Sequence, residues 1–136
     1  MRENLETIEK NRILIVDDEP DIAQVLKMGL EDNGFAVDAY NDPLDAISNF
    51  EVGSYDLLLI DIKMPKMNGF ELYNKLHQID ENAKICFITA FEIYYDDFKR
   101  MFPKVKVECF IRKPVSINNL ARVIKDELRQ QDGTKD

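Results

Sequence analysis

The 136-residue sequence lacks any apolar stretch near 18 residues, so no membrane-spanning helix is expected. Its first residues, MRENLETIEKN, lack the apolar middle of a secretion signal, which makes the cytoplasm the expected location. Basic residues are also in short supply, because 18 Lys and Arg face 26 Asp and Glu, for a net charge of −8. A nucleic-acid backbone needs a basic stripe, so we expect neither direct nucleic-acid binding nor membrane binding.

Histidine and cysteine are almost absent, which limits the metal and nucleophile chemistry open to the chain. The single histidine, His77, falls on a predicted polar helix face and is expected to be solvated surface rather than a catalyst. The two cysteines, Cys86 and Cys109, each lie inside an apolar run, and no CxxC or HxxxH pattern accompanies them. Without a secretion signal, we expect two buried free thiols.

Three segments, 13–16, 57–60 and 85–88, are near-continuous apolar runs. Strands that are apolar on both faces are typical of a parallel sheet covered by helices on each side. The more mixed segment 35–40 suits a strand nearer an edge, and 108–112 suits a short fifth strand. The length favours one domain over 1–136, with a core at about 11–130 and flexible ends at 1–10 and 131–136.

Helical patterns follow each predicted strand. Helix starts are indicated by capping residues, by proline in the first turn or by a glycine that leads into the pattern, at Asp18-Glu19-Pro20, Asp42-Pro43, Gly69 and Ser116. Asn33-Gly34 indicates the end of the first helix, and a fourth pattern, rich in aromatic rings, runs over 91–102 and ends before Pro103. Five repeats of strand then helix predict right-handed crossovers and a three-layer α/β sandwich.

Polar residues stand where four of the strands end. They are Asp17 and Asp18, Asp61, Thr89 and Lys113. Each alone has an ordinary explanation: a helix start, a cap, a strand-end hydroxyl or a solvated lysine. The carboxyl ends of parallel strands share one edge, where ligands bind, so their joint occurrence predicts a site.

The chemistry of that site follows from the residue types. Three neighbouring carboxylates repel one another, and a hard divalent cation such as Mg²⁺ removes the repulsion. A carboxylate can act as a nucleophile toward phosphorus, while an ammonium and a hydroxyl hold the phosphoryl oxygens. The pattern therefore predicts Mg²⁺-dependent phosphoryl transfer to an aspartate.

The motifs ILIVDDEP (13–20), LLLIDIKMPKMNG (57–69), ITA (88–90) and FIRKP (110–114) resemble the receiver domain of two-component response regulators. The resemblance covers roughly residues 11–130. It implies a flavodoxin-like (βα)5 fold whose five-stranded parallel sheet has the order 2-1-3-4-5.

The resemblance also implies roles for the site residues. Asp61 would accept the phosphoryl group from a histidine kinase or a histidine phosphotransfer protein. Mg²⁺ would be bound by Asp17, Asp18, Asp61 and the backbone carbonyl of Lys63. Thr89 and Lys113 would engage the phosphoryl group, and Thr89 with Phe110 would form the switch.

The expected function is that of a stand-alone receiver, a phosphoprotein that switches its binding to a downstream target protein in phosphorelay signal transduction. It would catalyse only its own phosphorylation and slow dephosphorylation, so we do not expect an enzyme. A homodimer through the face made by the fourth helix, fifth strand and fifth helix is left open. Tyr94 and Tyr95 could anchor such a partner or simply pack against the sheet.

Two other functions compete with this interpretation. A phosphatase of the haloacid dehalogenase type also uses a strand-end aspartate and Mg²⁺, but it needs an acid/base aspartate where this chain has Lys63. A degenerate receiver would bind partners without phosphate, but all five functional side chains are present here.

The stretch RMFPKVKVE (100–108) departs from the family pattern, because many members carry Gly-Ala before the fifth strand. This departure concerns the partner face made by the fourth helix, fifth strand and fifth helix, and it does not affect the phosphorylation residues.

Overall fold

The computed structural model describes residues 10–90, 96, 100 and 109–133. One parallel sheet has the order β2-β1-β3-β4-β5 and consists of β1 (Arg12–Val16), β2 (Ala36–Tyr40), β3 (Leu57–Asp61), β4 (Lys84–Thr89) and β5 (Phe110–Arg112). Four helices lie in the described part of the chain: α2 (Pro20–Asp32), α3 (Pro43–Ser48), α4 (Gly69–Ile79) and α6 (Ile117–Gly133). The predicted flavodoxin-like architecture and strand order are confirmed.

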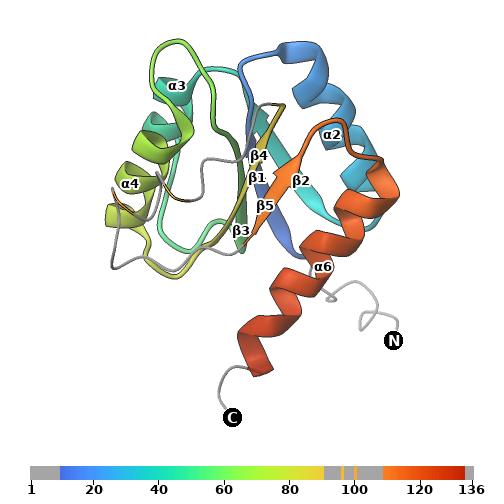
Figure 1. The fold of residues 1–136 in the computed structure, drawn as a ribbon. Helices are drawn as coiled ribbons and strands as arrows, with labels where there is room; N and C mark the ends of the chain where they lie inside the picture. The colour runs from blue at the N-terminus through green and yellow to red at the C-terminus, as the bar shows by residue number, and fades with distance from the viewer. Residues whose placement is uncertain (1–9, 91–95, 97–99, 101–108, 134–136) are drawn as a thin grey trace.

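The helices cover the sheet on both faces. Figure 1 shows α3 and α4 on one side of the sheet and α2 and α6 on the other. The carboxyl ends of the strands lie at the upper edge in that view, where the loops after β1 and β3 emerge. Right-handed crossovers between parallel strands require this arrangement, with helices on both faces.

Two cores form because successive residues of a strand point to opposite faces of the sheet. On the side of α3 and α4, Leu14 and Val16 join a cluster that includes Phe70. On the side of α2 and α6, Ile13 and Ile15 join the second cluster. The middle parts of the central strands are therefore apolar on both faces of the sheet, which explains the near-continuous runs in the sequence.

The helix boundaries follow from the capping residues. Pro20 begins α2, and the Asp42 side chain accepts a hydrogen bond from the Leu44 N–H (2.9 Å) at the start of α3. The Ser116 hydroxyl accepts from the Asn119 N–H (3.1 Å) before α6. Gly34, with φ of 97°, lies just past the end of α2, in the left-handed region that glycine adopts without steric cost. These predicted starts and stops are confirmed.

The two cysteines form a disulfide, so the prediction of free thiols is wrong. The register pairs Phe87 of β4 with Phe110 of β5, and the preceding residues, Cys86 and Cys109, therefore lie opposite each other. Their Cα atoms are 4.6 Å apart, a separation that a disulfide can bridge. The separate apolar runs in the sequence did not reveal this register.

His77 is half-buried rather than fully solvated: its ring lies against that of Tyr73, one helical turn earlier, and its Nδ1 is 3.2 Å from the Tyr73 hydroxyl. The ring-rich pattern over 91–102, with Tyr94 and Tyr95, falls almost wholly outside the described residues. So does most of RMFPKVKVE, and the interpretations of both segments remain predictions. Within the described ranges, no helix has the length and apolar character needed to cross a bilayer.

Candidate functional site

Three carboxylates meet at the carboxyl edge of the sheet. Asp17 and Asp18 directly follow β1, and Asp61 is the last residue of the neighbouring strand β3. The register pairs Val16 with Ile60, so the next residue on each strand is an aspartate. One carboxylate oxygen from each of the three residues lies within 4.8 Å of the others. The predicted convergence of these acids is therefore found.

Lys113 brings a positive charge to the same place from the far side of the sheet. Its Nζ donates a hydrogen bond to Asp17 Oδ2 (2.7 Å) and lies 3.6 Å from Asp61 Oδ2. Its backbone N–H donates to the Thr89 carbonyl (2.8 Å), and this hydrogen bond holds the Lys113 backbone beside the end of β4. Because β3 and β4 lie between β1 and β5, the long lysine stem is needed to reach Asp17.

Thr89 ends β4 next to Ile88, the residue that pairs with Asp61. Its side chain is buried, and its neighbour Ala90 lines the open cleft. The register therefore places Thr89 at the same sheet edge as Asp61. Its predicted contact with a phosphoryl group remains a proposal.

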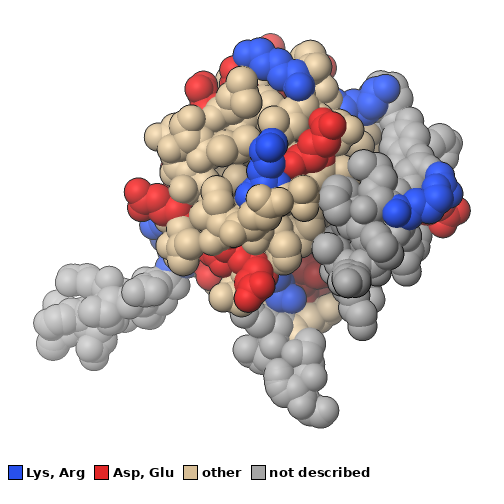
Figure 2. All heavy atoms as spheres, turned by 90° about the vertical axis from the view of Figure 1, so that its left-hand side faces the viewer, with Lys and Arg blue, Asp and Glu red and all other residues tan. Residues whose placement is uncertain are grey.

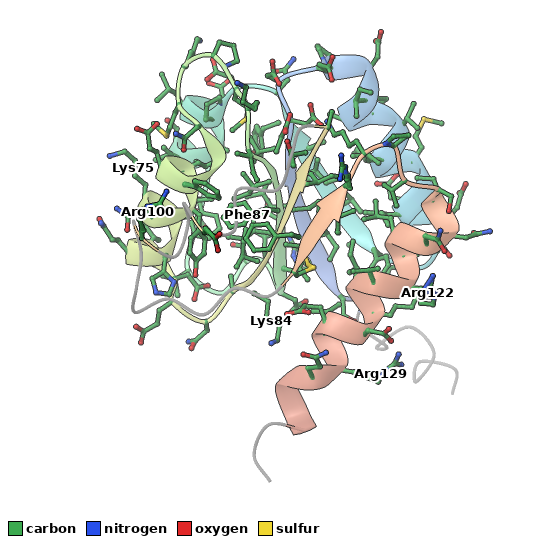
Figure 3. All side chains as sticks on the ribbon, in the orientation of Figure 1. Lys75, Lys84, Phe87, Arg100, Arg122 and Arg129 are labelled. Carbon is green, nitrogen blue, oxygen red and sulfur yellow. A yellow bond between two sulfur atoms is a disulfide. The ribbon has the colours of Figure 1, made fainter. Side chains whose placement is uncertain are left out.

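Phe110, the predicted switch residue, begins β5 and is partly buried. Its ring stacks on Phe87 of β4, with the ring centroids 5.6 Å apart and the planes 28° apart. Phe87 in turn meets Phe70 of α4 edge-on, at 5.0 Å. Figure 3 shows Phe87 on the side of the sheet that carries α4. Phe110 is thus joined to the core by a chain of aromatic contacts.

The sharp turn after Asp61 shapes the cleft. The Gly69 N–H donates to the Ile62 carbonyl (2.8 Å), so the chain returns to β3 before α4 begins. A Cβ atom at Gly69 would collide with the backbone carbonyl oxygen of Asp61, so only glycine fits there. Lys66, within the loop, pairs with Asp42 (2.7 Å) and ties the loop to the start of α3.

An open cleft of about 680 Å³ lies over these residues. Its lining includes acids, the lysine and the loop after β3: Asp18, Glu19, Asp61, Lys63, Met64, Pro65, Asn68, Ala90 and Lys113. Two polar residues of this lining, Glu19 and Asn68, were not assigned to the site from the sequence. Glu19 lies 4.0 Å from Lys113 Nζ, and Asn68 caps α4 in a reciprocal capping box with Glu71. The pattern Asn-x-x-Glu before a helix could have identified Asn68.

Burial raises the pKa of Asp61 to about 6; Lys113 opposes the rise, and the charges of Asp17 and Asp18 add to it. Burial acts to lower the pKa of Lys113, but its hydrogen bond to Asp17 and the nearby carboxylates outweigh that effect and raise it. The site therefore holds more negative charge than one lysine offsets. A group of this kind favours a bound cation.

The donor set fits Mg²⁺. Three carboxylates, from Asp17, Asp18 and Asp61, offer hard oxygen ligands beside an open cleft that leaves room for water. Mg²⁺ prefers such oxygen ligands and retains several of its waters. The side chain of Lys63 is exposed at the same cleft, and the predicted role of its backbone carbonyl remains a proposal.

The sheet order and the polar cleft at its carboxyl edge define an α/β protein of the flavodoxin-like class. Comparison with known families gives the finer assignment. The response regulator receiver domain family matches residues 13–125, and the chain belongs to that family.

Curated relatives support the same family. The uncharacterized transcriptional regulatory protein YkoG of Bacillus subtilis is 31% identical over 128 residues, which are 94% of this chain and 55% of that protein. The transcriptional regulatory protein PcoR of Escherichia coli is 27% identical over 119 residues, 88% of this chain and 52% of that protein. The chain thus spans about half the length of these relatives.

Solved structures agree with the fold. A CheY-like response regulator receiver domain protein from Methanospirillum hungatei has a TM-score of 0.78 and 31% identity, covering 93% of this chain and 99% of that one. The response regulator TrrA of Thermotoga maritima, crystallised in complex with Mg²⁺ and BeF, has a TM-score of 0.72 and 30% identity. That match covers 85% of this chain and 97% of TrrA.

Proposed function

We propose that the chain is a phosphorylation-dependent switch in two-component signalling, with Asp61 as the residue that accepts the phosphoryl group. The donor is a histidine kinase or a histidine phosphotransfer protein. The observation that carries the proposal is the convergence of Asp17, Asp18 and Lys113 on Asp61 at one open cleft. Membership of the receiver family supports it.

The reaction follows from the positions of the side chains. An Asp61 oxygen attacks the phosphorus, the bond from phosphorus to the donor nitrogen breaks, and an acyl phosphate forms. Mg²⁺ held by the three carboxylates would neutralise charge on the transferred group. The Lys113 ammonium, 3.6 Å from Asp61 Oδ2, is close enough to pair with a phosphoryl oxygen attached there. Thr89 would donate its hydroxyl to another oxygen.

The signal would leave the site through Thr89 and Phe110. A Thr89 hydroxyl drawn toward the phosphoryl group moves the end of β4, against which the backbone of Lys113 is hydrogen-bonded. The stacked ring of Phe110, three residues before Lys113, then repacks and changes the surface offered to a downstream target. A homodimer through the face that includes β5 and α6 is a second use of the same surface.

The phosphatase alternative is disfavoured by Lys63, since a lysine exposed beside the cleft cannot act as the acid/base aspartate of that class. We therefore propose a phosphoacceptor that turns over no external ester. We propose a cytoplasmic location, where the chain would meet its kinase. The stand-alone arrangement remains a prediction, because the curated relatives extend well beyond the matched region.

No direct contact with nucleic acid is proposed for the described part of this chain. Figure 2 looks onto the side that carries α3 and α4, where basic and acidic side chains are interspersed among the described residues. The net charge of −8 adds to this argument.

The test is phosphorylation by a small donor, phosphoramidate, in the presence of Mg²⁺. We expect the intact mass to rise by one phosphoryl group, and the gain to vanish in Asp61→Asn and without Mg²⁺. Asp32→Asn, an equal charge change at the exposed end of α2, should leave the gain unchanged. A wild-type protein that gains no mass, or an Asp61→Asn protein that still does, would overturn the proposal. Steady hydrolysis of a phosphate ester would favour the phosphatase instead.

A further inference from the structure

The disulfide lies in the core on the side of the sheet that carries α2 and α6. Cys86 is fully buried, and Cys109 is 5% exposed. Figure 3 shows the sulfur–sulfur bond close to the sheet, on the side toward α6. The bond joins Cys86 of β4 to Cys109, the residue just before the short strand β5, and the next residues along the two chains, Phe87 and Phe110, are paired in the register.

The two linked strands are the two that carry the proposed switch. Within β4 the chain passes from Cys86 through Phe87 to Thr89, and around β5 it passes from Cys109 through Phe110 to Lys113. The pair next to the disulfide is Phe87 and Phe110, whose rings stack on the opposite face of the sheet. The disulfide therefore lies one residue before Phe110 on one strand and one residue before its stacking partner Phe87 on the other.

The ends of this strand pair are held differently. At the upper end, the Lys113 N–H donates to the Thr89 carbonyl (2.8 Å), a bond that can lengthen or re-form. At the lower end, the Phe87 N–H donates to the Cys109 carbonyl (2.9 Å), and the disulfide adds a covalent link. Because β5 has only three residues, one covalent link fixes a large part of its position relative to β4.

We propose that Cys86 and Cys109 form a reversible redox pair that sets how far β5 moves against β4 when Asp61 is phosphorylated. The inference rests on the function proposed above. In the oxidised protein, the link restrains Phe110 and weakens the response to phosphorylation. In the reduced protein, the two strands are joined by hydrogen bonds alone, and the response is larger.

The redox step balances as thiol–disulfide exchange. Two thiols lose two protons and two electrons to a small-molecule disulfide such as oxidised glutathione, which becomes two thiols. A dithiol reductant reverses the step, breaking the bond between Cys86 and Cys109 and leaving with its own disulfide. Disulfides within a reducing compartment are usually of this reversible, redox-sensing kind.

Burial of both sulfur atoms affects how fast the exchange occurs. An external thiol or disulfide must reach a sulfur atom before exchange can start, and the rate depends on that access. Exchange at this buried pair is therefore slow, so the redox state stays constant over many cycles of phosphorylation and dephosphorylation.

The experiment compares oxidised and reduced wild-type protein, prepared with oxidised glutathione and with dithiothreitol. Transition metals are first removed by chelation, because Cys86, Cys109 and Glu127 could hold a soft cation once the thiols are free. Each sample is labelled with nitrogen-15 and phosphorylated with phosphoramidate and Mg²⁺. Mass spectrometry reports phosphoryl incorporation and thiol alkylation, and NMR reports the amide shifts of residues 110–112.

We expect equal phosphoryl incorporation in the two redox states. The shift changes of residues 110–112 on phosphorylation should be about twofold or more larger in the reduced protein, as for coupling through a packed network. Amides of β2, at the other edge of the sheet, serve as the internal reference. The double variant Cys86→Ala/Cys109→Ala should give the reduced response in both buffers, and the single variant Cys109→Ala should do the same.

Equal shift changes in the two redox states, with normal phosphorylation, would overturn this inference alone. Loss of the fold on reduction would also overturn it, because the bond would then be a structural brace. Failure of phosphorylation in both states would overturn the proposed function, and this inference with it.

Discussion

The ammonium group of Lys113 donates a 2.7 Å hydrogen bond to Asp17, although 96 positions separate the two residues in the chain. Asp17 is fully buried, and the Lys113 side chain is 13% exposed, so this is a nearly dry ion pair. It joins the segment after β5 to the segment after β1, across the carboxyl ends of β3 and β4. Several measurements can test what this contact and its neighbours do.

Lys113→Met should lower the free energy of unfolding of the metal-free protein by about 3 kcal/mol, because it leaves Asp17 buried and unpaired. Urea denaturation measures the change. The matched control is Lys27→Met, which removes an exposed ion pair with Glu31 on α2 and should cost less than about 0.5 kcal/mol. Similar losses in the two variants would contradict the importance of the buried pair.

Mg²⁺ should raise the melting temperature, because the carboxylate cluster exists only in the folded chain. At a concentration about 100 times its Kd, the ion should add about 3 kcal/mol to stability. Asp18→Asn removes one of the three ligands and should abolish most of the shift, whereas Asp32→Asn should retain it. The cluster is not a cation site if calorimetry finds equal shifts in Asp18→Asn and the wild type.

Asp61 should make the metal-free protein less stable as the pH rises. Its pKa is raised from 3.8 to about 6, so the folded protein holds this proton more tightly than the unfolded chain does. The stabilisation is fully present below pH 3.8 and is lost as the pH rises through about 6. Asp61→Asn should therefore be more stable than the wild type at neutral pH, by up to about 3 kcal/mol.

Chemical denaturation across this pH range, in the presence of a chelator, gives the difference between the two proteins. The difference should shrink as the pH falls toward 4, because the wild-type carboxyl then becomes neutral as well. A difference that does not depend on pH would show that the charge of Asp61 is not its cause.

Gly69→Ala should distort the site itself. The added Cβ would collide with the backbone carbonyl oxygen of Asp61, which cannot move without displacing the carboxylate. We expect slower phosphorylation by phosphoramidate together with lower stability. In Gly29→Ala the added Cβ would collide with the branched side chain of Ile117, between α2 and α6, so stability should fall too. That collision does not involve Asp61, so phosphorylation should proceed at the wild-type rate. Equal phosphorylation rates in the two variants would contradict this argument.

The sequence predicted the fold because local signals and global pattern agree. Apolar runs such as Leu57–Ile60 require burial on both faces, and caps such as Asp42 and Ser116 mark where helices begin. The convergence of Asp17, Asp18, Asp61 and Lys113 was also predictable, since parallel strands end at one edge. Predicting that the three acids and the lysine converge requires only the strand order and does not depend on detailed side-chain packing.

What could not be predicted depends on register and on side-chain contacts. The pairing of Cys86 with Cys109 requires knowing that β5 lies beside β4 with Phe110 opposite Phe87. The partial burial of His77 depends on its contact with Tyr73, which polarity along a helix does not reveal. Glu19 gave no sign of its approach to Lys113, because that contact arises from how the loop after β1 turns.

Asp61, the proposed phosphoacceptor, stands at the end of β3, every residue of which is buried, while Phe110 belongs to a three-residue strand at the border of the sheet. In the proposed switch, a phosphoryl group added at the end of this central, buried strand would leave the strand in place and displace the short edge strand instead. The change would then appear at the border of the sheet, where a partner protein could bind it.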